Sequence, residues 1–117
     1  MTSDVTGDVT GDVSTVQITS DGPTLLLSGD FDVRSTASVR NAIYDHLFCW
    51  DGDIVVDLHA VPSVDLTALK VLGAACRRAS VEGQHIVVRG ATGQVLRMLH
   101  LTHLIRVIEV EREPIAV

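Results

Sequence analysis

Two short stretches near the start of the chain have the apolar patterns of paired strands. Residues 16–19 (VQIT) alternate between apolar and polar side chains, which is typical of a half-buried strand. Residues 24–28 (TLLLS) form a more continuous apolar run, as a more deeply buried strand requires. Between them, Asp21-Gly22-Pro23 combines a glycine that tolerates positive φ with a proline that fixes φ. The pattern therefore predicts a β-hairpin.

Apolar residues further along recur at spacings of three and four, which indicates one buried face of a helix. The first such helix is expected to begin near residues 34–36 and to end at 51–53, where Gly52 supplies a left-handed residue. Its expected apolar face comprises Val39, Ala42, Ile43, Leu47 and Trp50. The second helix is expected over 66–81, with Asp65 as its N-cap. Its expected apolar face comprises Leu69, Leu72, Cys76 and Ala79.

The remaining elements complete an alternating order of strands and helices. Residues 54–58, 85–88 and 105–110 each predict a strand, and a short helix is expected from Thr92 to about Leu101. The resulting order is β-β-α-β-α-β-α-β, in which helical crossovers connect parallel strands. We therefore predict an α/β fold with a mixed, mostly parallel β-sheet and helices packed mainly on one side.

The length of 117 residues is enough for one domain, which we expect over residues 15–112. Residues 4–14 read DVTGDVTGDVS, an acidic repeat that cannot form a core face. Residues 1–14 are therefore expected to form a flexible, low-complexity tail. The alternative for residues 1–14 is a phosphorylated or partner-ordered arm. Residues 113–117 are expected to form a second tail.

Charge and composition narrow the classes of partner. The net charge of −6 argues against nucleic acid or an anionic membrane as the main partner. No apolar run approaches the roughly 20 residues of a membrane span, and the first residues lack the features of a signal peptide. Two cysteines fit free thiols in a reducing compartment better than a disulfide scaffold. We expect a cytoplasmic protein.

Acidic and hydroxyl side chains gather in two short segments. A role as helix N-cap is enough to account for Asp65, and it leaves Thr67 free for contact or phosphorylation. Asp30 and Asp32 follow a strand, and with Asp65 they either bind a divalent cation or serve as turn and cap residues. The cap and turn interpretation is favoured because no further ligand follows at suitable spacing.

The histidines and cysteines give weaker signals of a functional site. His100 and His103 are expected to share one helix face, but without a third ligand they indicate a solvated edge rather than a zinc site. Cys76 lies on the apolar face of its helix and fits a buried, inert thiol, while Cys49 stands at the end of the first helix. The sequence contains no nucleophile elbow, phosphate-binding loop or CxxC motif, so no catalytic set emerges from the residues, and we expect no metal and no cofactor.

The element order and two segments together resemble the STAS domain, a family that includes the anti-sigma factor antagonists of bacteria. The first segment, LLLSGDFDVRSTASVRNAI, contains residues 29–32, which fit the Gly-x-x-Asp that ends a strand before the first helix of the family. The second segment, IVVDLHAVPSVDLTALKVLGAA, contains Asp57-Leu58 and then residues 65–69 (DLTAL) in place of the family's Asp-Ser-Ser-Gly-Leu. The resemblance covers about residues 15–112.

This resemblance implies a binding module and not an enzyme. Such a module sequesters a kinase-like anti-sigma factor and so frees a sigma factor for transcription. In the family, the kinase phosphorylates the serine after the aspartate, and the phosphate breaks the complex. This chain has Leu66 at that position, then Thr67 and Ala68. Three modes of control remain open: none, phosphorylation shifted to Thr67, or oxidation of Cys49 and Cys76.

The resemblance places the partner surface at the N-terminus of the second helix and the neighbouring loops. We predict that its residues are Asp30, Asp32, Asp65, Leu66, Thr67 and Lys70. The alternatives are a small-ligand or nucleotide sensor and a scaffold module without an anti-sigma partner. The expected oligomeric state is a monomer or weak homodimer.

Overall fold

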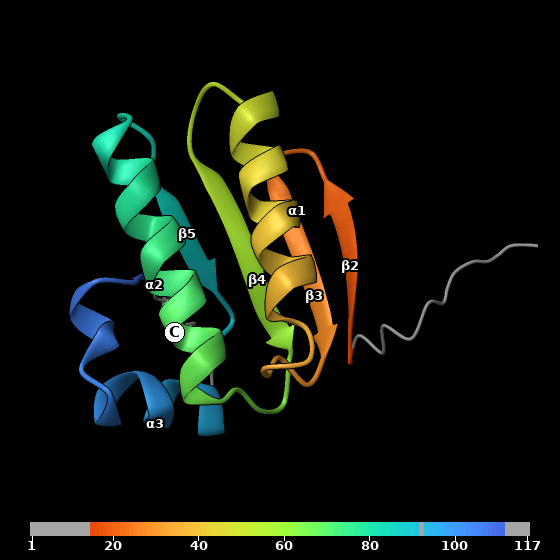
Figure 1. The fold of residues 1–117 in the computed structure, drawn as a ribbon, viewed down its shortest axis with the longest axis vertical. Coiled ribbons are helices and arrows are strands. Elements are labelled where there is room, and N and C mark those ends of the chain that lie inside the picture. Colours follow the sequence, from red (N-terminus) through yellow and green to blue (C-terminus); the bar gives the residue numbers. More distant parts are fainter. Residues whose placement is uncertain (1–14, 92, 112–117) are drawn as a thin grey trace, which may run out of the picture.

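The computed structural model describes residues 15–91 and 93–111, which form a single α/β domain. Figure 1 shows one twisted β-sheet with helices packed against it. In chain order the elements are β2 (Val16–Asp21), β3 (Thr24–Gly29), α1 (Thr36–Cys49), β4 (Ile54–Ala60), α2 (Leu66–Val81), β5 (Ile86–Arg89), α3 (Gly93–Leu101), the 3₁₀ helix η1 (Leu104–Arg106) and β6 (Glu109–Val110). The expected tails, and the cap expected at Thr92, lie outside the described residues.

The sheet is mixed and mostly parallel, as the sequence predicts. Its order is β2-β3-β4-β5-β6. The β2–β3 pair is antiparallel and turns at Gly22, whose φ is +60°. The pairs β3–β4, β4–β5 and β5–β6 are all parallel. The hairpin and the parallel crossovers are therefore both confirmed.

Helices α1 and α2 lie side by side over one face of the sheet, and α3 lies near one end of it (Figure 1). The core between the layers is almost wholly aliphatic. From α1 it buries Val39, Ile43 and Leu47, and from α2 it buries Ala68, Leu69, Leu72, Gly73, Ala75, Cys76 and Ala79. The helical spacing thus identified both buried faces, except that Trp50 lies beyond the end of α1 and is 40% exposed.

Two local predictions are wrong. Gly52 does not take the left-handed conformation, because α1 ends at an extended Trp50. The expected strand over 105–110 is largely replaced by η1, and only Glu109–Val110 pair with β5. Atoms of Leu104, Val107 and Ile108 lie 3.5 to 4.0 Å from the place where Gly73 of α2 would carry a Cβ. The apolar residues of this segment therefore pack against a helix instead of extending the sheet.

Candidate functional site

The loops that follow β3 and β4 are joined at the carboxyl ends of these strands. Phe31 and Val64 form an isolated parallel bridge. The amide of Phe31 donates to the carbonyl of Ser63 at 3.1 Å, and the amide of Asp65 donates to the carbonyl of Phe31 at 3.3 Å. Phe31 is fully buried and Val64 nearly so. The two loops are therefore joined into one tip, which we call the α2 tip and define as residues 30–34 and 63–70.

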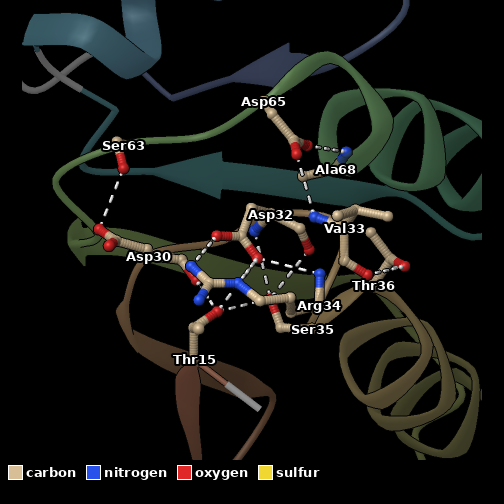
Figure 2. Close-up of polar contacts among 10 residues, drawn as sticks. All are labelled: Thr15, Asp30, Asp32, Val33, Arg34, Ser35, Thr36, Ser63, Asp65 and Ala68. Carbon is tan, nitrogen blue, oxygen red and sulfur yellow. Dashed lines mark hydrogen bonds and ion pairs between the residues drawn. The ribbon is translucent and has the colours of Figure 1, made fainter. Parts of the chain in front are cut away.

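The carboxylate of Asp65 connects both halves of the α2 tip (Figure 2). Its Oδ1 accepts a hydrogen bond from the amide of Ala68 at 2.8 Å, which caps α2 as the sequence predicts. Its Oδ2 accepts a hydrogen bond from the amide of Val33 at 3.0 Å. One side chain thus satisfies an amide at the start of α2 and another in the loop before α1.

Asp32 is held by the residue two positions further along the chain. Nη2 of Arg34 lies 2.7 Å from Oδ2, and both Nε and the backbone amide of Arg34 donate to Oδ1 (Figure 2). These contacts with Arg34 hold the pKa of the Asp32 carboxyl below its ordinary value of 3.8, against a smaller desolvation effect. Thr15 Oγ1 also donates to Oδ1 at 3.2 Å. Asp32 is therefore an ionised anchor that fixes the loop.

Asp30 completes the acidic trio. Its Oδ1 accepts from the hydroxyl of Ser63 at 3.0 Å, and its backbone carbonyl accepts from Thr15 Oγ1 at 2.6 Å. Each of the three carboxylates thus accepts hydrogen bonds from protein donors. In the described ranges, no group of three or more His, Cys, Asp or Glu residues is arranged to hold a metal ion. The contacts support the turn and cap interpretation.

The outer surface of the α2 tip combines apolar and polar side chains. Leu66 is 44% exposed and Val33 is 61% exposed. The hydrogen bond from Val33 to Asp65, the residue before Leu66, brings these two segments together. Thr67 and Lys70 are exposed in the first turns of the same helix. The six residues predicted for the partner surface therefore lie on two connected segments.

The structure adds a residue that the sequence analysis missed. Oε1 of Gln94, in the first turn of α3, accepts from the amide of Val64 at 2.9 Å, and its Nε2 donates to the carbonyl of Val64 at 3.1 Å. The side-chain amide pairs with Val64 as a neighbouring strand would. Gln94 therefore fixes the α2 tip from the side opposite Phe31. Val33 was missed as well, and neither residue carries a signal in its local spacing.

The other candidate residues are dispersed. Cys49 is exposed at the end of α1, whereas Cys76 is buried, and burial raises the pKa of its thiol to about 11. This pKa disfavours the reactive thiolate of Cys76 at neutral pH. His100 lies in the last turn of α3, but His103 follows that helix with a φ of +62°. The expectation that the two histidines share one helix face is wrong.

Comparison with known proteins identifies the family. The family model described as "Mlab, STAS domain" matches residues 14–109, so the chain belongs to the STAS domain family. No curated protein shows significant sequence similarity to the chain. No helix in the described part of the chain is long and apolar enough to cross a membrane.

Several solved structures share the fold. An anti-sigma factor antagonist from Mycobacterium paratuberculosis superposes with a TM-score of 0.65 at 21% identity, covering 89% of this chain and 90% of that one. SpoIIAA, an anti-sigma factor antagonist solved in its unphosphorylated form, gives a TM-score of 0.64 at 13% identity and coverages of 84% and 89%. A sulfate transporter family protein from Wolinella succinogenes gives 0.60 at 15% identity, with coverages of 74% and 73%. At these identities the similarity establishes the fold alone.

Proposed function

We propose that this chain is a non-enzymatic regulatory module of the anti-sigma factor antagonist type. It binds a kinase-like anti-sigma factor through the α2 tip and thereby releases a sigma factor. The observation that carries the proposal is the double contact of Asp65, which joins two loops and presents Leu66 beside the segment of Val33. The family and the fold of the antagonists support the choice of partner.

The apolar part of this surface supplies binding energy. Leu66 is 44% exposed, so a partner that covers it removes roughly half of a leucine side chain from water, which contributes about 1 kcal/mol. Val33, at 61% exposed, contributes a similar amount. Lys70, one turn further along α2, is placed to meet an acidic residue of the partner. Asp30, Asp32 and Asp65 shape the tip from within, and Thr67 offers a hydroxyl contact.

Control of binding follows from the residues of the first turn of α2. Leu66 has no hydroxyl, and Thr67 is the one hydroxyl residue among positions 66–69. A phosphate on Thr67 would gain from the helix N-terminus but would lie close to the carboxylate of Asp65. Phosphorylation at Thr67 would be a shifted form of the family's switch, because Thr67 is the hydroxyl residue next to the position of the family's serine. Oxidation of Cys49 and Cys76 is a competing mode, which the burial and raised pKa of Cys76 disfavour, and an unchanged mass after mild oxidation would eliminate it. The absence of any such control is the third mode.

The proposal places the protein in the cytoplasm, as a monomer or weak homodimer, without nucleic acid or membrane as its partner. The net charge of −6 supports the exclusion of polyanionic partners. The fold also occurs in a sulfate transporter family protein. The fold is thus not confined to anti-sigma factor antagonists. The second candidate function is a scaffold module without an anti-sigma partner, and stable self-association in light scattering would favour it.

The test uses the full chain to capture its partner from the native cytosol, followed by calorimetric titration with the purified partner. Recovery of a histidine-kinase-like ATPase of anti-sigma type supports the proposal, whereas recovery of a transporter or sensor complex overturns it. In the titration, Leu66→Glu should weaken binding at least tenfold because a charge replaces a buried apolar contact. It should leave thermal stability nearly unchanged, since a carboxylate suits the first turn of a helix.

The matched control is Val81→Glu. Val81 is 85% exposed and lies at the opposite end of the same helix, so its substitution adds the same charge away from the α2 tip. The control should bind the partner with the affinity of the unaltered chain. Equal weakening by both substitutions would show that the partner does not use the α2 tip.

A further inference from the structure

A cavity of about 840 Å³ lies apart from the α2 tip, where β4 and β5 end and face α3 and β6. Its lining includes His59, Arg89, Leu96, Ile108 and Glu109, and none of its lining residues belongs to the α2 tip. Cavities that bind small molecules in proteins enclose roughly 300–1,000 Å³. The volume therefore fits a small organic ligand.

The floor of the cavity is a closed ion pair. Nη2 and Nε of Arg89 contact Oδ2 of Asp57 at 3.0 and 3.1 Å, and the amide of His59 donates to Oδ1 at 2.8 Å. The side chain of Asp57 is only 12% exposed, and that of Arg89 is 38% exposed. The two charges compensate each other, so the floor offers hydrogen-bonding groups with little net charge.

A close backbone contact builds one wall of the cavity. A Cβ on Gly90 would lie only 2.7 to 2.9 Å from atoms of His59, and Gly90 has a φ of +79°. Glycine is therefore required where the turn after β5 meets the end of β4. This contact keeps the polar floor beside the apolar side chains of Leu96, Ile105 and Ile108, which form the rest of the wall.

The uncompensated charge of the cavity lining comes from two glutamates near the C-terminal end of the described residues. Glu109 and Glu111 also line the cavity, and both are exposed. His85 lies 3.7 Å from Glu109 and compensates its charge only when protonated. The charges of Asp57 and Arg89 cancel, so the Asp, Glu and Arg side chains of the lining sum to a net charge of −2, which comes from these two glutamates.

We propose that this cavity binds a small organic cation, an ammonium or amidinium group attached to an apolar body. The apolar body packs against Leu96, Ile105 and Ile108, and the cationic group faces Glu109 and Glu111. An anion is disfavoured because it would meet both glutamates, while Arg89 is already neutralised by Asp57. The proposal does not depend on the function of the α2 tip.

The test compares three probes that share one apolar body: 4-phenylbutylamine, 4-phenylbutanol and 4-phenylbutyrate. Binding to the full chain is followed by amide chemical shifts in NMR titrations at pH 7 and low salt. The amine should bind with about tenfold higher affinity than the alcohol, because each unit of net charge about 6 Å away changes affinity about threefold. The butyrate should bind most weakly. Shifts should be largest at His59, Gly90 and Ala91.

Substitutions of exposed residues separate the site from general charge effects. Glu109→Gln and Glu111→Gln should each weaken binding of the amine about threefold and leave binding of the alcohol unchanged. The control is Glu82→Gln, which removes the same charge at the exposed end of α2 and should have no effect. The proposal is overturned if the butyrate binds as well as the amine, if shifts map elsewhere, or if all three variants weaken binding equally. Because no partner is needed, failure here leaves the proposed function standing.

Discussion

The double contact of Asp65 makes a quantitative prediction about stability. Asp65→Ala removes both the N-cap bond to Ala68 and the bond to the amide of Val33. Loss of an aspartate N-cap costs about 1 kcal/mol, and loss of the second bond costs about another 1 kcal/mol. The expected destabilisation of about 2 kcal/mol corresponds to a fall in Tm of roughly 6–10 °C for a domain of this size.

Asp65→Asn divides this total between the two contacts. Asparagine caps a helix as well as aspartate, so its side-chain oxygen retains the bond to Ala68. Its amide group then faces the N–H of Val33 and cannot accept from it. The variant should therefore lose about 1 kcal/mol. Amide hydrogen exchange should accelerate at Val33 in both variants, but at Ala68 only in Asp65→Ala.

Urea denaturation, followed by circular dichroism, measures both free energies of unfolding. The control is Asp51→Ala at an exposed bend, which should change stability by less than about 0.5 kcal/mol. Equal stability of Asp65→Asn and the unaltered chain would refute the contribution of the Val33 contact. Equal destabilisation by Asn and Ala would show that the cap contributes nothing.

The remaining predictions concern the support of the α2 tip and the ionisable groups. Gln94→Ala should lower the free energy of unfolding in urea by about 1 kcal/mol and accelerate amide exchange in the loop before α2. Gln94→Glu should lower it further, because a carboxylate oxygen would face the carbonyl of Val64. An unchanged exchange rate would contradict the role of Gln94. Arg34→Gln should raise the pKa of Asp32 toward 3.8 in an NMR titration, because hydrogen bonds from Arg34 lower it. Since the pKa of Asp32 is lower in the folded than in the unfolded chain, the stabilisation from Asp32 is present above about pH 4 and is lost as the pH falls through the lowered pKa. If Arg34→Gln leaves the pKa of Asp32 unchanged, Arg34 is not the cause of its lowering. Brief alkylation at pH 8 should label Cys49 and spare Cys76, because burial raises the pKa of Cys76 to about 11; equal labelling in mass spectrometry would contradict it.

The local pattern of apolar residues predicted most of the fold, because each buried face lies within one short segment of the chain. The spacing of Val39, Ile43 and Leu47 identified α1 without knowledge of what covers it. The same reasoning failed at residues 105–110, where apolar residues fit either a strand or a 3₁₀ helix packed on α2. The choice depends on packing against α2 at Gly73, more than thirty positions away in sequence from Leu104.

The candidate site was only partly predictable for the same physical reason. The cap at Asp65 is a local property, since Ala68 is three residues away. The contacts from Val33 to Asp65 and from Gln94 to Val64 connect residues separated by 32 and 30 positions. No spacing within either segment encodes them. They exist only because β3, β4 and α3 bring their ends together.

These long sequence separations also bear on the order of folding. Contacts between distant residues form only after the intervening chain has closed, which carries an entropic cost. The bond between Val33 and Asp65 joins residues 32 positions apart, and it requires the ends of β3 and β4 to lie side by side, as they do once these strands have paired. An incompletely folded chain therefore lacks the joined loops. A partner that requires the whole α2 tip would therefore discriminate the folded chain from a chain whose two loops are not yet joined, and its binding rate during refolding would report when they join.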